Sequence, residues 1–286
     1  MTKIDDANYT SIIPTAFVTA YPRTFTDIPY SSEIFEGLEA FRKKEHLPEI
    51  GEDQKIDRLA PELEARHKLI DKLLAISGAT QVLELAAGLS TRGLLFSAKP
   101  LNLYAELDLE EMVEMKNKIL SQIKTLPSNL RIVSGNALRL ADINNAVSSF
   151  NPKKPVAVVN EGLLRYLNFD EKTQIAKNVR EILSRFGGVW ITCDTTSKKF
   201  LATQDKVTKP GMNKKLSSIS GKNFEDNMFE DNEHAVKFFS NLGFSVEVHP
   251  FTEILDELTS PKILDYSLEE TVELFGPAVV VVMRLR

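Results

Sequence analysis

The chain has 286 residues, a length that allows one large domain or a core domain with an extra lobe. Apolar residues make up 43% and charged residues 26%, close to the soluble globular average, which excludes a disordered or fibrous chain. The net charge of -5 lacks the basic excess that binding to nucleic acid needs, so we expect no nucleic-acid partner.

Metal sites and membrane segments are also unexpected. Cys193 is the single cysteine and cannot form an internal disulfide, and the four histidines lack the spacing of metal ligands. The first residues contain acids by position 5 and no apolar run typical of a secretory signal, and no stretch of about 18 apolar residues occurs. We therefore expect a cytoplasmic protein with no metal and no membrane partner.

The first part of the chain differs in pattern from the rest. Residues 1–79 contain five prolines and then an amphipathic segment at 62–77 with Leu63, Leu69, Ile70, Leu73 and Leu74 on one stripe. This pattern predicts a helical N-terminal cap over residues 1–79, ahead of a core domain over residues 80–286.

From residue 80 onward, short β-branched or apolar runs alternate with amphipathic segments. This alternation is typical of a parallel sheet covered by helices on both faces and predicts an α/β, doubly wound, seven-stranded sheet. The predicted strands cover residues 81–86, 102–107, 130–134, 156–160, 188–193, 245–249 and 278–285. Helices are predicted over 109–123 and over 170–186, the latter with Asp170 as N-cap and Gly187 at its end. An antiparallel edge strand is possible near the chain end.

A polar insertion rich in Lys and Ser, residues 195–231, interrupts the sheet between its fifth and sixth predicted strands. A segment of this length inside a domain is typically a lid or a surface insertion. We favour the lid, and the plain insertion remains the alternative.

Small residues follow the first predicted strand, at the junction where the backbone of a doubly wound sheet approaches a ligand. Ala86 and Gly88 permit such an approach, and Asp108 comes twenty positions after Gly88. An acid at this distance can accept hydrogen bonds from both hydroxyls of a ribose. The alternative is a turn glycine and a helix N-cap that have met by coincidence.

The segment contains neither G-x-G-x-x-G nor a phosphate-binding P-loop motif. Glu84 stands inside it, which suits a ligand with a cationic amino-acid end and no pyrophosphate. S-adenosylmethionine fits that description. A nicotinamide-dependent oxidoreductase remains an alternative because an acid at the same spacing serves it too, although the missing glycines count against it.

Three motifs resemble one family in register: ELAAGLSTRG, ELDLEEMVEMK and EGLLRYL. They resemble the leucine carboxyl methyltransferase family, in particular its bacterial branch of polyketide-type O-methyltransferases. The resemblance covers roughly residues 10–195 and the last strand. It implies a class I methyltransferase-like fold that uses S-adenosylmethionine. The chain departs from the family at Ala86, Ser90 and Asn136, which leaves a non-catalytic cofactor-binding protein as a third hypothesis.

The resemblance also implies roles for single residues. Asp108 matches the ribose-binding acid, with Glu106 as a nearby alternative, and Asn136 and Ala137 fall where the family holds the adenine. Glu161 resembles a glutamate facing the methionine portion, and Arg66 an arginine that reaches the cofactor carboxylate. A helix-start acid and a solvated arginine are the alternatives for these last two. The expected cofactor-binding residues are Arg66, Glu84, Ala86, Gly88, Glu106, Asp108, Asn136, Ala137 and Glu161.

The methyl acceptor is harder to predict. Methyl transfer is an in-line displacement that depends on alignment, and an ionised carboxylate acceptor needs no general base. The sequence shows no clear His or Glu base near a motif, which mildly favours a small molecule bearing a carboxylate over one with a hydroxyl. Arg165, Tyr166 and Arg23 are the candidate substrate anchors. Solvent exposure of Arg165, core packing of Tyr166 and fastening of the cap by Arg23 are the alternatives.

Overall fold

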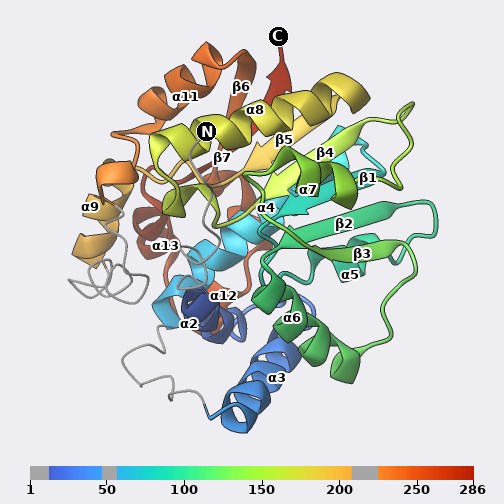
Figure 1. Ribbon diagram of the computed structural model, residues 1–286. Helices are drawn as coiled ribbons and strands as arrows, with labels where there is room; N and C mark the ends of the chain where they lie inside the picture. Colours follow the sequence, from blue (N-terminus) through green and yellow to red (C-terminus); the bar gives the residue numbers. More distant parts are fainter. Residues whose placement is uncertain (1–12, 47–56, 208–224) are drawn as a thin grey trace.

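Seven strands form one sheet in the part of the chain that the computed structural model describes, residues 13–46, 57–207 and 225–286 (Figure 1). The strands are β1 (Gln81–Leu85), β2 (Leu103–Asp108), β3 (Leu130–Ser134), β4 (Val156–Asn160), β5 (Gly188–Thr192), β6 (Phe244–Pro250) and β7 (Val279–Leu285). The helices are α2 (Ile13–Arg23), α3 (Ser31–Lys44), α4 (Ala60–Ser77), α5 (Arg92–Phe96), α6 (Glu110–Ile123), α7 (Leu140–Ala146), α8 (Phe169–Phe186), α9 (Lys198–Val207), α11 (Asn232–Asn241), α12 (Ser260–Ile263) and α13 (Leu268–Phe275).

The strand order is β3-β2-β1-β4-β5-β7-β6. Neighbouring strands among the first five are parallel, whereas β7 is antiparallel to both β5 and β6. An antiparallel edge strand near the chain end, which the sequence left possible, is present: β6 is the edge and pairs antiparallel with β7, which lies between β5 and β6. Met283 of β7 is the register partner of Trp190 on one side and of Val246 on the other.

The two faces of the sheet pack against different helices. Residues such as Val82 and Ile191 belong to the core cluster that includes α4 and α6, whereas their neighbours Leu83 and Trp190 belong to the cluster of α7, α8 and α11. All four side chains are fully buried. Strands covered on both faces read as continuous apolar runs, which is why the sequence located them well.

Helix α8 begins one step earlier than predicted. Asn168, and not Asp170, is the N-cap: its side chain accepts from the backbone of Glu171, and the Glu171 side chain accepts from the backbone of Asn168. This reciprocal capping box satisfies two backbone donors at once, which a single aspartate at position 170 would not. Gly187 ends the helix as predicted.

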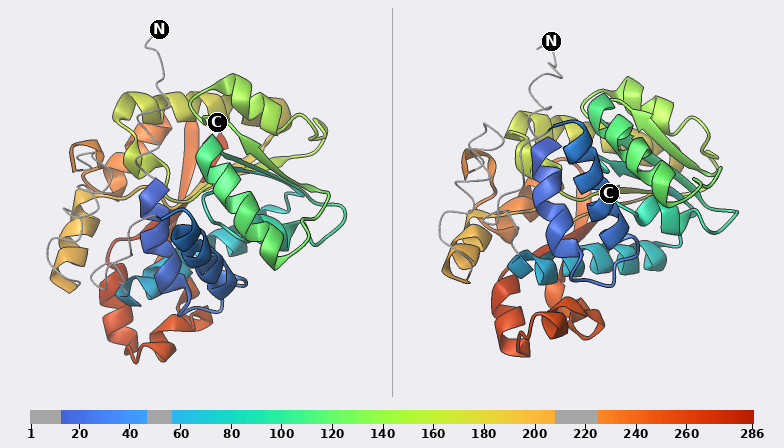
Figure 2. Two further views of the ribbon diagram at one scale, coloured as in Figure 1. Left: turned by 60° about the horizontal axis from the view of Figure 1, so that its bottom comes forward. Right: turned by 90° about the horizontal axis from the view of Figure 1, so that it is seen from below.

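The predicted N-terminal cap consists of two parts. Helix α4 packs within the core cluster on one face of the sheet, and Ala20 of α2 with Ile34 and Leu38 of α3 belongs to the same cluster. In the right-hand view of Figure 2, α2 and α3 (blue) lie side by side. Gly37 lets α3 approach α6 closely, because a Cβ at this position would come within 2.7 Å of Ile119. No helix of the described segments is long and apolar enough to cross a membrane.

The described ends of the 195–231 insertion are joined to the core. Ser197 and Phe229 form an isolated parallel bridge, and α9 follows directly. Lys172 of α8 donates to the carbonyl oxygen of Asn227 at 2.8 Å. Residues 208–224 lie outside the described residues, so closure of this insertion as a lid stays a prediction.

Candidate functional site

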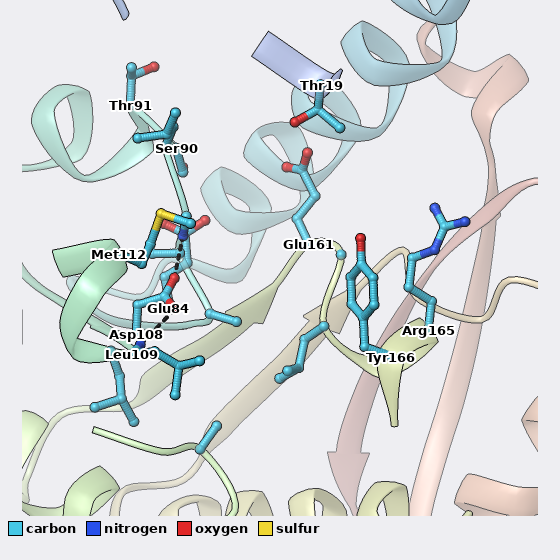
Figure 3. A pocket seen from close by; sticks show the side chains of 18 of the residues that line it. Thr19, Glu84, Ser90, Thr91, Asp108, Leu109, Met112, Glu161, Arg165 and Tyr166 are labelled. Carbon is cyan, nitrogen blue, oxygen red and sulfur yellow. Dashed lines mark hydrogen bonds between the residues drawn. The ribbon is translucent and has the colours of Figure 1, made fainter. Parts of the chain in front are cut away.

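A cavity of about 200 Å³ lies at the carboxyl ends of β1, β2 and β4, where residues of α2 and α4 also reach it. It brings together every predicted site residue except Glu106. The predicted residues that line it are Arg23, Arg66, Glu84, Ala86, Gly88, Asp108, Asn136, Ala137, Glu161, Arg165 and Tyr166. In Figure 3, Asp108 and Met112 stand on one side, Arg165 and Tyr166 on the other, and Glu161 between them.

The turn after β1 holds the carboxylate of Asp108. The backbone N–H of Gly88 donates to Asp108 Oδ2 at 2.6 Å, and that of Leu109 donates to Oδ1 at 2.8 Å (Figure 3). Burial raises the pKa of Asp108, and the two backbone donors oppose this. Each carboxylate oxygen can accept a second hydrogen bond, so the side chain can also receive two hydroxyls.

Ala86 adopts a backbone conformation that usually belongs to glycine. Its φ is +52°, in the left-handed region, and its N–H donates to the carbonyl oxygen of Leu107 at 2.8 Å. A left-handed alanine costs about 1 kcal/mol relative to glycine. Alanine at position 86 therefore keeps the turn but with a strained backbone.

Glu106 does not line the cavity. Its carboxylate forms a buried ion pair with Lys116 of α6, with Nζ and Oε2 2.5 Å apart. Burial raises the pKa of Glu106 to about 7, although the Lys116 ammonium opposes this. Asp108 is therefore the better candidate for a ribose-binding acid, and Glu106 is a core residue behind it.

The loop after β3 forms another wall. Asn136 Oδ1 accepts from the backbone of Leu138 at 2.9 Å, and the carbonyl of Ala137 accepts from Asn178 of α8 at 2.9 Å. Met112, four residues after Asp108, adds an apolar wall that the sequence reasoning missed. Its position on the first turns of the helix after β2 was the available signal.

Glu161 is surrounded by arginines from distant parts of the chain. Its Oε1 accepts from Arg23 Nη2 at 2.6 Å and from Arg66 Nε at 2.9 Å, while Oε2 accepts from Arg92 Nη2 at 3.0 Å. Burial alone would raise the pKa of Glu161, but the guanidinium groups of Arg23 and Arg66 bring it well below its usual value. Glu161 is thus ionised, and Arg66 is not a solvated side chain.

Arg23 carries an incompletely balanced charge. Burial, with Arg66 and Arg92 nearby, lowers its pKa in spite of its contact with Glu161. Among the described residues, the buried Nε of Arg23 has no hydrogen-bond partner. Buried donors are nearly always satisfied, so this atom fits an anionic or carbonyl group of a ligand. Arg23 also fastens α2 to the end of β4, as the alternative interpretation proposed.

A second cavity of about 70 Å³ adjoins the first and shares Thr19, Arg66, Gly162, Arg165 and Tyr166 with it. Its other wall includes Phe200 and Leu201 of α9. Tyr166 packs against Leu201 and Met228 rather than into the main core, and the Arg165 guanidinium lies over the Tyr166 ring at 5.9 Å. Arg165 and Tyr166, two of the three predicted anchors, therefore stand at the boundary between the cavities, whereas Arg23 lines only the first.

Asp194, which the sequence reasoning missed, shapes the loop that carries Glu161. It follows β5 closely and accepts from the backbone N–H groups of Gly162, Leu163 and Leu164 at 2.6 to 3.0 Å. A buried carboxylate with several backbone donors holds a loop rigidly. An acid directly after a central strand was the signal in the sequence. Across the described ranges, no group of three or more His, Cys, Asp or Glu could hold a metal ion.

The fold and the cavity define a doubly wound α/β protein whose cavity lies at the carboxyl ends of the central strands, the position at which such folds bind ligands. The sequence profile of the leucine carboxyl methyltransferase family matches residues 14–180. The chain belongs to this family, which confirms the predicted resemblance and its class I methyltransferase-like fold.

Two bacterial relatives are candidate S-adenosyl-L-methionine-dependent methyltransferases. The protein of Mycobacterium marinum is 25% identical over 62% of this chain and 56% of its own length. That of Mycolicibacterium smegmatis is 27% identical over 57% of this chain and 58% of its own length. The chain thus spans little more than half the length of these relatives. Among solved structures, magnesium protoporphyrin IX methyltransferase of Synechocystis PCC 6803 is similar with a TM-score of 0.49 and 12% identity, over 88% of this chain and 94% of that one.

Proposed function

We propose that this chain transfers the methyl group of S-adenosylmethionine to a carboxylate or hydroxyl oxygen of a small molecule. The observation that carries the proposal is the placement of two different polar sites on one cavity. Asp108 stands at one end, held by Gly88, and Glu161 stands with Arg23 and Arg66 at the other. A ribose diol and a zwitterionic amino acid are the two polar parts of this donor.

Asp108 would hold the donor by its ribose. Both carboxylate oxygens are already oriented by backbone donors, so little conformational entropy is lost when hydroxyls bind to them. Leu109 and Met112 supply apolar surface next to Asp108, which suits the adenine ring. Asn136 and Ala137 supply backbone and amide groups on the next wall.

The cluster around Glu161 would hold the methionine portion. Its carboxylate suits the ammonium group, and Arg66 with the unpartnered Nε of Arg23 suits the carboxylate. When bound, the donor supplies a methyl group on a positive sulfur, which an acceptor oxygen can attack without an enzyme nucleophile. What the chain contributes is alignment of the two partners and exclusion of water.

The acceptor would occupy the second cavity, on the far side of Arg165 and Tyr166. An acceptor carboxylate is ionised at neutral pH and would be attracted by Arg165, which lines the second cavity, whereas Arg23 lines only the first. We propose such a small carboxylic acid as the preferred class, with a phenol or alcohol as the other. Apolar side chains such as Phe200 and Leu201 would surround the remainder of the molecule.

Calorimetry with S-adenosylhomocysteine and with NADH tests the donor. We expect the wild type to bind the first and not the second. Asp108→Asn should weaken S-adenosylhomocysteine binding by about 30-fold, because the amide NH₂ opposes the Gly88 or Leu109 donor and can no longer accept both hydroxyls. The matched control is Asp170→Asn on the exposed start of α8, which should leave the affinity unchanged.

Two outcomes would contradict the proposal. Binding of NADH without S-adenosylhomocysteine would favour the oxidoreductase. Full affinity in the Asp108→Asn protein would remove the proposed ribose contact. A screen with tritiated methyl donor against carboxylic acids, phenols and peptides then tests transfer, and tight donor binding with no labelled acceptor would indicate a non-catalytic cofactor-binding protein.

A further inference from the structure

Arg92 lies behind the cavity wall and is absent from its lining. It begins α5, directly after the turn that contains Ala86 and Gly88, and its side chain is only 2% exposed. A buried arginine is costly unless its donors are paired. The hydrogen-bond partners of Arg92 therefore indicate its role.

The partners are two carboxylates of the cavity and two groups of α4. Nη1 donates to Glu84 Oε1 at 2.6 Å, and Nη2 donates to Glu161 Oε2 at 3.0 Å. Nε donates to Asp71 Oδ1 at 2.5 Å, and Nη2 lies 3.0 Å from His67 Nδ1. One planar guanidinium thus spans β1, the end of β4 and α4.

Glu84 and Glu161 are both about 5% exposed or less and both line the cavity. Two such carboxylates sharing one guanidinium would repel each other without it. Tyr104 adds a second donor to Glu84, at 2.8 Å, but no charge. Burial lowers the pKa of Arg92, but Asp71, Glu84 and Glu161 raise it well above its usual value, so the charge is permanent.

The fixed fork of the guanidinium also sets orientation. By holding Oε2 of Glu161 from behind, Arg92 leaves Oε1 on the side of Arg23 and Arg66, which line the cavity. Lysine could supply the charge but not the planar fork that donates to both carboxylates at once.

We propose that Arg92 is a positioning residue, which holds the carboxylates of Glu84 and Glu161 in the orientation that suits the amino-acid end of the methyl donor, without touching the donor itself. This inference rests on the proposed function and deepens it. It predicts that the effect of Arg92 is confined to ligands that carry the amino-acid end. The adenosyl end lies at Asp108, which is not a partner of Arg92.

Two ligands separate a positioning role from a structural one. S-adenosylhomocysteine carries the amino-acid end, and 5′-methylthioadenosine lacks it. We expect Arg92→Met to weaken S-adenosylhomocysteine binding at least 10-fold in calorimetry, since a buried charge partner is lost, and to change methylthioadenosine binding less than 3-fold. Arg92→Lys should recover part of the loss, because the charge returns without the fork.

Lys116→Met is the matched control. It also removes a buried cation from a buried carboxylate, Glu106, but outside the cavity lining. We expect it to affect both ligands equally or not at all. Equal weakening of both ligands by Arg92→Met, or unchanged S-adenosylhomocysteine affinity, would overturn the positioning role alone. Failure of the wild type to bind either ligand would overturn the proposed function with it. If the methionine variant does not fold, the lysine variant and the same ligand pair decide.

Discussion

The two ends of the site are built in different ways. At the proposed donor end, Gly88, Asp108 and Leu109 come from two consecutive turns of the sheet, and their contacts are short hydrogen bonds to backbone N–H groups. At the proposed acceptor end, the second cavity gathers side chains from α2, α4, α9 and the start of β7, which are far apart in sequence.

This difference explains what each end can do. A site made by neighbouring turns of the sheet is held in place by the fold itself, so it suits a ligand that never changes. A wall made by an insertion can vary without disturbing the sheet, so it suits a specificity pocket. Glu161 and its arginines lie between the two and link the cap to the sheet.

The largest effect is expected at that link. Glu161→Gln would leave Arg23, Arg66 and Arg92 facing a neutral amide in a buried setting. We expect a loss of about 3 kcal/mol in the free energy of unfolding and of about 100-fold in S-adenosylhomocysteine affinity. Denaturant unfolding and calorimetry check both values.

The control for this variant is Glu247→Gln, which removes an exposed carboxylate paired with Arg284 at 3.2 Å. Exposed pairs contribute about 0 to 1 kcal/mol, so its stability should hardly change. Equal losses in the free energy of unfolding for the two variants would show that the ion pairs of Glu161 contribute no more than an exposed surface pair.

A second prediction concerns acid. The pKa of Glu161 is lower in the folded state than the usual 4.5, because Arg23 and Arg66 overcome the effect of burial. Its stabilising contribution is therefore complete above about pH 4.5 and is lost as the pH falls through the lower folded-state value. Between pH 6 and pH 3, the free energy of unfolding should fall less steeply with decreasing pH for Glu161→Gln than for the wild type. Parallel curves would contradict this.

A substitution at the proposed acceptor end should lower activity without changing the affinity for the donor. Phe200→Ala changes a side chain that lines only the second cavity. We expect S-adenosylhomocysteine affinity within about 2-fold of the wild type, and kcat/KM for an acceptor found in the methyl screen lowered about 10-fold. A large loss of donor affinity would show that the two ends are not separate.

The smallest effect tests the strained turn of the donor end. Ala86→Gly should stabilise the protein by up to about 1 kcal/mol, because glycine relieves the left-handed conformation, less the entropy that glycine loses on folding. Ala87→Gly, one residue on and without a positive φ, should destabilise it by about 0.5 to 1 kcal/mol. In thermal unfolding, the changes in stability of the two variants relative to the wild type should have opposite signs. Changes of the same sign would contradict the proposed strain at Ala86.

Most of the sheet could be predicted because its strands are buried apolar runs. The ranges of β3 and β4 agree with the prediction at both ends, and β1 and β5 end one residue earlier than predicted. The predicted N-cap of α8 was wrong. Asn and Asp are both common N-cap residues, and only the reciprocal contact with Glu171 distinguishes Asn168 from Asp170. The place of β7 between β5 and β6 depends on long-range pairing that no local pattern records.

The donor end was predictable for the same reason that it is rigid. Gly88 follows β1 and Asp108 ends β2, so their spacing alone predicted that the two would meet, as they do. Glu106 was misjudged because the sequence does not show that Lys116 reaches it. The convergence of Arg23 and Arg92 on Glu161 joins residues more than sixty positions apart, and only the folded chain brings them together.

The position of β7 also sets an order of assembly during synthesis. Strand β6 leaves the ribosome before β7, but within the described sheet β7 is the strand with which it pairs. Until residues 279–285 emerge, β6 has no strand of the sheet to pair with, and the outer edge of β5 has no paired strand. Ribosomes add about 5 to 20 residues per second, so this interval is brief but unavoidable. A nascent chain stalled before β7 should therefore lack two strands of the sheet, not one.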